Sequence, residues 1–467
     1  AVYLVLLFHA GSAKFVGGFI GVDLFFVLSG FLVTNVVLVD LAEHGKLRVG
    51  RFYARRARRL IPAASLTVIG TALGALLVTN LVDRLHLVDD ARAASLWYAN
   101  WHFLDESNDY FGAAESETPY LHFWSLAIEE QFYLVFPVFI VVMWRVGRRR
   151  ADILFGAVGV LLIVSVIVQL ALAQVGQNRA YLGSDARAYQ LLAGVALAVA
   201  LWRWALPGSL RSAARVGAPI ALALLVLAGT RAVDVSVSHR GFIAAGLTGL
   251  VIVMLEASRS GPLTSVLACA PIRYLGQISY GTYLWHWPIL VLSRRVLDMT
   301  PFAAFVLSAS LGTGLAALSH AIVEGPVRRS DFLRPRPGTT IAFGVFVAVA
   351  TGLVVAPAVL ESDRKPAVSP LGAAVAASEP DASGSPDGTT SKAPAAGSGV
   401  SERSRVPELD WAALASKAAD VPECRASDGS DCVVVEGSAG VVLIIGDSHA
   451  QMLLPALEEI AVRRDLT

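Results

Sequence analysis

The feature of this sequence that most restricts its fold is a series of long apolar segments. A helix that crosses a lipid bilayer needs about 20 mostly apolar residues. We expect the first segment to be the second half of a helix that starts before residue 1. The eleven segments are 1–10, 16–39, 60–80, 121–144, 151–175, 186–204, 215–231, 241–257, 275–293, 301–322 and 339–360. They predict an all-α polytopic membrane bundle of about ten transmembrane helices plus one more.

The composition supports a membrane protein. Only 16% of the 467 residues are charged, 55% are hydrophobic, and the mean hydropathy is +0.60. Soluble globular proteins carry about 25% charged residues, so most of this chain must face lipid. The three cysteines exclude a disulfide scaffold and a cysteine-rich metal cluster. We expect no metal and no nucleic-acid partner, and Cys269 is expected to be a small core residue.

Lysine and arginine are distributed unevenly between the predicted loops. The stretch 43–59 holds seven of them against one acid, whereas the loop 81–120 has eight acids against two arginines. Basic residues concentrate on the cytoplasmic side of membrane proteins. The pattern predicts a multi-pass membrane protein with its N-terminus inside and its C-terminal region outside. Arg294 and Arg295 depart from this pattern, because the predicted topology places them outside.

The composition changes again after residue 360. Residues 361–405 are rich in Ala, Ser, Pro and Gly and contain no aromatic residue. Such a segment cannot bury a core, and it predicts a flexible linker. We therefore expect four parts: a transmembrane domain at 1–335, an additional transmembrane helix at 336–360, an extracytoplasmic linker at 361–410, and a truncated α/β fragment at 411–467.

The last part contains a candidate nucleophile. Residues 441–445 form an apolar run typical of a buried strand, and Gly446, Asp447, Ser448 and His449 follow it as a tight turn. A serine at the tip of such a turn, before a helix, is placed to attack an acyl carbon. Ser448 is therefore a predicted nucleophile. His449 is adjacent in sequence and is not assigned as its base.

Several ionisable residues fall inside the predicted spans, where they are costly and mark functional sites by default. They are His9, Asp23, Glu129, Glu130 and His286. Structural alternatives remain open: His286 could simply bind a neighbouring helix, and Asp23 could cap its helix from the interface. Glu129 and Glu130 are harder to explain structurally, because adjacent side chains on a helix point about 100° apart.

A dense arginine cluster precedes the third apolar segment. It consists of Arg55, Arg56, Arg58 and Arg59. Such clusters occur in cytoplasmic loops of transporters and enzymes alike. This one is denser than orientation requires, and guanidinium groups suit a phosphate-rich ligand.

Five short motifs together resemble acyltransferase family 3 of membrane acyltransferases. They are FHA at 8–10, GVDLFFVLSGFL at 21–32, FYARRARRLIP at 52–62, FWSLAIEEQFYLVFP at 123–137 and ISYGTYLWHWP at 278–288. The resemblance implies a helical bundle that takes an acyl group from cytoplasmic acyl-CoA, with acetyl-CoA expected, and delivers it to an extracytoplasmic acceptor.

The resemblance also implies roles for individual residues. His9 would act as general base on an acceptor hydroxyl or hold the acyl group briefly. A carboxylate such as Glu129 would orient an imidazole, and the arginines at 55–59 would meet the phosphates of CoA. The turn around Ser448 resembles the first block of the SGNH hydrolase family.

A family 3 domain followed by a span and an SGNH-like unit resembles the O-acetyltransferases that modify bacterial cell-surface polysaccharides. The predicted function is transfer of an acetyl group to polysaccharide hydroxyls, with Ser448 as a relay nucleophile. One alternative is a transporter of a solute or lipid-linked glycan, against which the tethered serine argues. Another is a membrane-anchored SGNH esterase, which would leave the polar residues of the spans without a purpose.

Overall fold

The computed structural model describes residues 1–105, 118–148, 150–258 and 261–362, and every regular element in these ranges is helical. The predicted linker beyond Ser362, the unit at 411–467 and Ser448 lie outside the described residues. The helices are α1 (Val2–His9), α2 (Ile20–His44), α3 (Val49–Val78), α4 (Leu81–Ser95), α5 (Ala99–Asp105), α6 (Phe123–Val146), α7 (Ala151–Val175), α8 (Gln177–Leu182), α9 (Ser184–Arg203), α10 (Leu210–Ala228), α11 (Val237–Ser258), α12 (Pro262–Ala268), α13 (Ala270–Arg294), α14 (Pro301–Ser319), α15 (Gly325–Arg329), α16 (Pro337–Ala350) and α17 (Ala356–Leu360). Two π-helical turns, η2 (His320–Glu324) and η3 (Thr351–Val355), join α14 to α15 and α16 to α17.

A helix stands at each of the eleven predicted segments, so the all-helical polytopic bundle is confirmed. Eight helices of the described residues are long and apolar enough to cross a membrane. The other three segments correspond to α1, α9 and α13, and their crossing stays a prediction. The helix α1 has only eight residues. Polar residues such as Arg187 in α9 and His286 in α13 interrupt the apolar sequence of the other two.

Three expectations about local structure are wrong. The segment 81–120, predicted as a loop, contains α4 and α5, which are too polar to be recognised as spans. The arginines at 55–59 lie in the first half of α3 and not in a loop, because the helix starts at Val49. Cys269, expected in the core, is exposed at the N-terminal end of α13.

Small residues allow α2 and α9 to pack backbone against backbone. A Cβ atom on Gly30 of α2 would lie 2.0 Å from the carbonyl oxygen of Leu191, and one on Gly194 of α9 would lie 2.0 Å from that of Val27. Glycines at a helix crossing permit such close approach in membrane bundles. This crossing fixes the relative position of the two helices that carry Asp23 and Arg187.

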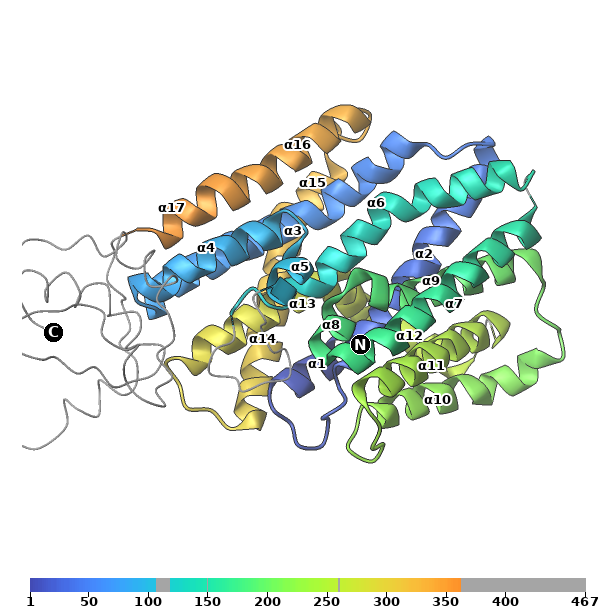
Figure 1. Ribbon diagram of the computed structural model, residues 1–467, viewed down its shortest axis with the longest axis horizontal. Helices are drawn as coiled ribbons and strands as arrows, with labels where there is room; N and C mark the ends of the chain where they lie inside the picture. Colours follow the sequence, from blue (N-terminus) through green and yellow to red (C-terminus); the bar gives the residue numbers. More distant parts are fainter. Residues whose placement is uncertain (106–117, 149, 259–260, 363–467) are drawn as a thin grey trace, which may run out of the picture. The chain divides into compact units, whose positions relative to one another are not determined.

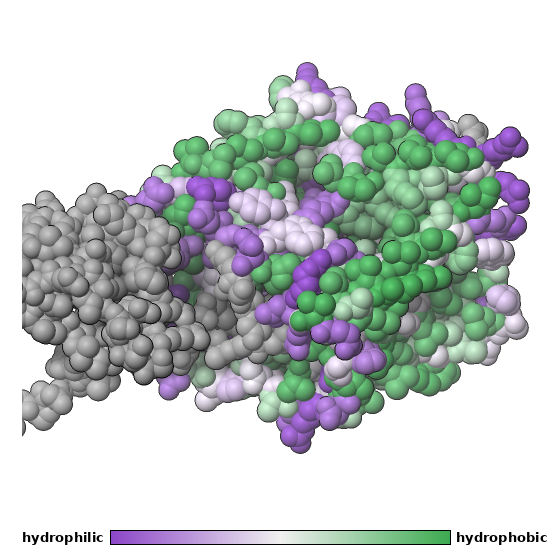
Figure 2. Space-filling model, viewed as in Figure 1, coloured by the Kyte–Doolittle hydropathy of each residue, from purple (hydrophilic) through white to green (hydrophobic). Residues whose placement is uncertain are grey.

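The long helices run side by side, with α16 and α17 lying along α3 and α4 (Figure 1). Figure 2 shows hydrophobic side chains over much of one face, with hydrophilic ones at its right-hand edge and in a band across the middle of the view. Large apolar side chains such as Leu134 and Phe346 are exposed on the surface of the bundle. An apolar surface of this extent is expected where helices face lipid.

Candidate functional site

The structure brings His9 and His286 together, although 277 residues separate them in sequence. His9 is the last residue of α1, and His286 lies in the middle of α13. Nδ1 of His9 lies 3.0 Å from Nε2 of His286. The two rings are nearly parallel, with an interplanar angle of 3°. Both side chains are buried. The two predicted histidines therefore form one hydrogen-bonded pair.

The helix α13 supplies most of the groups around this pair. His286 Nδ1 is hydrogen-bonded to the backbone carbonyl of Tyr283, one turn earlier. The ring of Trp287 lies 4.3 Å from that of His9, centroid to centroid. Arg294 Nη2 donates to the backbone carbonyl of His9 at 2.9 Å. These contacts hold the C-terminal end of α1 against the second half of α13.

A third histidine, His122, lies beside the pair. It is the residue before α6, it is buried, and its ring centroid is 5.8 Å from that of His286. The backbone of Leu284 in α13 lies beside its ring. Three histidines from α1, α6 and α13 therefore meet in one buried cluster, the histidine cluster. No group of residues suited to hold a metal ion occurs in the part of the chain that the structure describes.

Glu129 and Glu130 lie farther along α6. Both are half-buried, whereas the residues at 123–128 are buried. Glu129 accepts hydrogen bonds from Ser29 of α2 and Tyr133 of α6. The guanidinium of Arg56 stands 3.8 Å above the ring of Tyr133. The two predicted carboxylates therefore lie on the arginine-rich side of the histidine cluster.

Ser125 and Tyr283 form a hydrogen-bonded pair at the backbone of His122. Ser125 Oγ lies 2.7 Å from Tyr283 Oη, which donates to the backbone carbonyl of His122 at 3.2 Å. His122, Ser125 and Glu129 follow one another at spacings of three and four residues, which places them on one side of α6. Within the described residues, Glu129 is hydrogen-bonded to hydroxyl groups, and the ring next to His9 belongs to His286. The predicted role of Glu129 toward an imidazole stays a prediction.

The arginine-rich segment and the histidine cluster lie beside different parts of α3: Trp285, the neighbour of His286, packs on Gly70 in the second half of the helix. The arginine-rich segment is at the N-terminal end of α3, whose 30 residues span about 45 Å. The helix α4 follows its C-terminal end, and Asp83 of α4 forms a 2.7 Å ion pair with Arg295. Arg295 adjoins Arg294, which contacts His9. The two arginines that departed from the charge pattern thus hold the histidine end of the bundle together.

Asp23 is part of a buried ion pair. The helix α2 begins at Ile20, and Asp23 lies within its first turns without solvent exposure. It pairs with Arg187 of α9, and Gln190 Nε2 donates to the same carboxylate at 2.9 Å. The interpretation of Asp23 as a helix cap at the interface is therefore wrong. The residue before α2 is Phe19, and Asp23 instead ties α2 to α9.

Aromatic rings surround the guanidinium of Arg187. Its central carbon lies 4.6 Å from the ring centroid of Tyr181, 5.7 Å from that of Phe26 and 5.8 Å from that of Trp124. Aromatic faces attract cations, most strongly away from water. Tyr181 of the cage packs against Phe19, which packs against Phe8 beside His9, so the cage around Arg187 borders the histidine cluster.

The four predicted phosphate-binding arginines differ in their exposure and in their neighbours. Arg55 and Arg59 are exposed, whereas Arg56 is half-buried against Tyr133. Arg58 lies within electrostatic reach of Arg55 and of Arg334, from the segment between α15 and α16. One nitrogen of Arg58 is buried without a hydrogen-bond partner among the described residues. This end of the bundle is strongly positive, and its binding of CoA stays a prediction.

Comparison with known proteins identifies the family. The model of the acyltransferase domain of family 3 matches residues 1–321, which hold the histidine cluster, both carboxylates and the Asp23–Arg187 pair. This chain belongs to acyltransferase family 3.

Several curated relatives of this family 3 chain carry acetyltransferase names. It is 34% identical over 345 residues to the putative peptidoglycan O-acetyltransferase YrhL of Bacillus subtilis, covering 71% of this chain and 54% of that protein. It is 30% identical over 343 residues to the peptidoglycan O-acetyltransferase OatA of Listeria monocytogenes, covering 71% and 55%. The O-acetyltransferase OatA of Staphylococcus aureus is 30% identical over 342 residues, with 71% and 56% covered. The chain thus spans about half the length of these relatives. No solved structure matches it.

Five residues of the candidate site were not expected from the sequence. Ser29, Ser125 and Tyr283 lie within recognised motifs, but hydroxyl groups are common in helices and gave no separate signal. His122 directly precedes the motif at 123–137. Arg187 lies in none of the five motifs, and its only signal was a charge inside an apolar segment.

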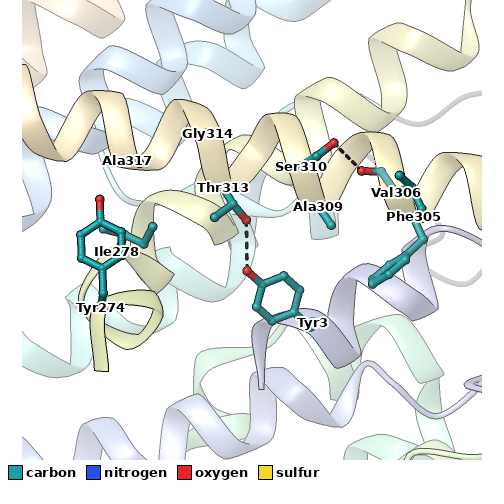
Figure 3. A pocket seen from close by; sticks show the side chains of 10 residues that line it. All are labelled: Tyr3, Tyr274, Ile278, Phe305, Val306, Ala309, Ser310, Thr313, Gly314 and Ala317. Carbon is teal, nitrogen blue, oxygen red and sulfur yellow. Dashed lines mark hydrogen bonds between the residues drawn. The ribbon is translucent and has the colours of Figure 1, made fainter. Parts of the chain in front are cut away.

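A surface hollow lies on another face of the bundle (Figure 3). It has a volume of about 540 Å³ between α1, α13 and α14. Tyr3 of α1 points to Thr313 of α14, and their hydroxyl oxygens are 3.1 Å apart. Mostly apolar side chains such as Phe305 and Ile278 line it, and none of the predicted site residues does.

Proposed function

We propose that this chain is the membrane unit of an O-acetyltransferase. In this proposal it takes acetyl groups from acetyl-CoA on the cytoplasmic side and delivers them to hydroxyl groups of a bacterial cell-wall polysaccharide. Peptidoglycan is the acceptor named for two of the relatives. The observation that carries the proposal is the His9–His286 pair at one end of a partly buried line of polar residues that starts at the arginine-rich end.

The line of polar residues supports transfer through the bundle. From Tyr133, beneath Arg56, to His122 there are eleven residues of α6, or about 16 Å of helix. Glu129 and Ser125 lie between them, and Ser125 contacts Tyr283 of α13. Polar groups inside a membrane bundle are expensive and mark substrate pathways. A simple helix-to-helix contact would not require so many in one line.

The imidazole of His9 can take part in the transfer by either of two routes. In the first, His9 takes the proton of an acceptor hydroxyl as its oxygen attacks the thioester carbon. The C–S bond then breaks, and the CoA thiolate receives that proton. In the second, a ring nitrogen of His9 attacks the thioester carbon and the C–S bond breaks, which leaves a CoA thiolate and a positively charged N-acetylimidazolium. The hydroxyl oxygen then attacks the acetyl carbon, the C–N bond breaks and the thiolate receives the hydroxyl proton.

The positive charge of the arginine-rich end supports this end as the binding site for acetyl-CoA. Acetyl-CoA carries phosphates, and guanidinium groups bind phosphate through charge-assisted hydrogen bonds. Arg58 lies within electrostatic reach of Arg55 and Arg334, and no carboxylate offsets their effect on it in the part of the chain described. The uneven distribution of basic residues supports a cytoplasmic position for this end.

Delivery to the polysaccharide is proposed to run through Ser448. The turn at 446–449 resembles the nucleophile block of SGNH hydrolases, and the predicted linker gives it freedom of movement. A flexible segment of 45 residues has a root-mean-square reach of about 35–40 Å. Ser448 would accept the acetyl group at the His9 end and pass it to a sugar hydroxyl.

The test is O-acetyl analysis of the cell wall from cells that express the full-length protein. His9→Ala should abolish acetylation, while the protein stays folded and abundant in detergent extracts. His86→Ala, which changes an exposed histidine of α4, is the matched control and should acetylate normally. A transporter would move its solute without consuming acetyl-CoA, and an esterase would lower the acetyl content. Wild-type acetylation by His9→Ala would refute the proposal.

A further inference from the structure

We infer that His286 is a positioning residue that holds His9 in the tautomer with its proton on Nδ1, so that Nε2 is the reacting nitrogen. The inference rests on the proposed role of His9 and goes beyond it. It assigns a function to the second histidine and names the reactive atom of the first.

The backbone carbonyl of Tyr283 determines which nitrogen of His286 carries the proton. A backbone carbonyl oxygen can only accept a hydrogen bond, and it is the partner of Nδ1 of His286. The proton of the neutral His286 ring must therefore be on Nδ1. In a neutral imidazole one nitrogen is a donor and the other is an acceptor. Nε2 of His286 is thus left with its lone pair.

The second step follows from the 3.0 Å distance between His286 Nε2 and His9 Nδ1. Because Nε2 of His286 is an acceptor, Nδ1 of His9 must be the donor. The neutral ring of His9 then carries its lone pair on Nε2. The hydrogen bond made by one ring nitrogen decides the protonation of the other, as for any histidine.

The surroundings keep this arrangement in place. The helix α14 packs closely on the backbone of His286, since a Cβ atom on Gly312 would lie 3.4 Å from the Cα atom of His286. The ring of Trp287 packs against His9, and its Nε1 donates to the carbonyl of Thr118 at 2.9 Å. A catalytic imidazole is effective when a second group fixes both its orientation and its tautomer.

The tautomer fits the chemistry of the proposed transfer. Nε2 of His9 takes the hydroxyl proton or bonds to the acetyl carbon, and the ring becomes positively charged. The proton stays on Nδ1 of His9 throughout and remains hydrogen-bonded to Nε2 of His286. That hydrogen bond becomes charge-assisted, and therefore stronger, only as the charge develops. When His9 loses the added proton or acetyl group, the starting tautomer returns.

Three substitutions separate this role from packing. His286→Gln has an amide oxygen that can reach toward the position of Nε2 and accept from His9. His286→Phe keeps a ring of similar size without an acceptor, and His286→Asn is too short to reach. Loss of the tautomer-fixing partner in a catalytic triad lowers kcat by about 10⁴-fold. We expect His286→Phe and His286→Asn to lower kcat by about 10³–10⁴-fold, and His286→Gln by no more than about tenfold. The KM for acetyl-CoA should change less than about twofold in all three, since His286 lies at the far end from the arginines.

The tautomer itself is measured by ¹⁵N NMR of the full-length protein, labelled at histidine and reconstituted in nanodiscs. The His9 signals are identified by their absence in His9→Gln. In the wild type, Nδ1 of His9 should carry the proton and Nε2 should not. In His286→Phe the proton should move to Nε2, the form that an unconstrained imidazole prefers. His86→Gln should leave both signals and the rate unchanged.

A proton on Nε2 of His9 in the wild type would overturn the inference, and so would a His286→Phe protein that keeps the wild-type tautomer or rate. Equal losses in His286→Gln and His286→Phe would show a packing role and would also overturn it. The proposed function fails by a different result, which is wild-type acetylation by His9→Gln. The NMR experiment reads the tautomer independently of activity, so the two failures are distinguishable.

Discussion

The buried pair of Asp23 and Arg187 should have a large coupling energy. Asp23→Asn or Arg187→Met removes one partner and leaves the other group buried, since both side chains are at most 1% exposed. Removing one member of a buried ion pair costs about 3–5 kcal/mol. Replacing both members with residues of similar volume is often neutral, because no charge then remains in the interior.

The contacts of each partner determine how much stability each single substitution costs within that range of about 3–5 kcal/mol. After Asp23→Asn, Arg187 keeps its aromatic cage, which contributes about 2 kcal/mol when desolvated. We therefore expect a loss of about 3 kcal/mol for Asp23→Asn and about 4–5 kcal/mol for Arg187→Met, which leaves the carboxylate with Gln190 as its partner. The double variant with Asp23→Asn and Arg187→Met should lie within about 2 kcal/mol of the wild type.

The assay is equilibrium unfolding in mixed micelles by increasing amounts of sodium dodecyl sulfate, followed by circular dichroism. The matched control is the exposed pair of Arg203 and Asp152, whose atoms are 2.8 Å apart. Its single variants should change the free energy of unfolding by less than about 1 kcal/mol. Additive losses in the double variant, or single losses below about 1 kcal/mol, would refute the reasoning.

The remaining predictions concern the site, the helix crossing, the topology and the relay. Glu129→Ala should abolish acetylation without reducing the amount of folded protein; loss of folded protein in parallel would indicate a structural role. Gly30→Leu should prevent stable assembly, because its Cβ would meet the Leu191 carbonyl at 2.0 Å, and thermal unfolding in detergent checks this. A cysteine at Gly50 should be shielded from an impermeant reagent outside the cell, and its labelling from outside would contradict the topology. In the full-length protein, Ser448→Ala should stop delivery to polysaccharide while thioester cleavage continues at least in part, as measured by trapping of the acetylated protein; normal surface acetylation would exclude the relay.

The helical bundle was predictable because a span is recorded locally in the sequence. About 20 apolar residues in a row are sufficient to identify one, and a helix stands at each of the eleven predicted segments. The helical segments that are rich in polar residues contain no such apolar run. The helix α4 mixes acids, arginines and apolar residues, and the first half of α3 is rich in arginine. Their helical structure depends on contacts with neighbours that the sequence does not reveal.

The residues of the candidate site could be singled out one by one from the sequence, but the contacts between them could not. Unusual residues within apolar segments identified His9, His286 and Glu129. The contact between His9 and His286 joins positions 277 residues apart, and Asp23 finds Arg187 at a separation of 164. Which helices meet is decided by packing, such as the glycine contact of α2 with α9. A single sequence holds no direct record of it.

Acetyl transfer across a sealed bilayer tests the central claim most directly. The protein is reconstituted in vesicles so that Arg55 and its neighbours face the interior, with acetyl-CoA enclosed and a soluble acceptor oligosaccharide outside. The account predicts that acetyl groups appear on the external acceptor with the wild-type protein and not with His9→Ala, while CoA stays inside. Acetylation only when donor and acceptor share one compartment would contradict the account.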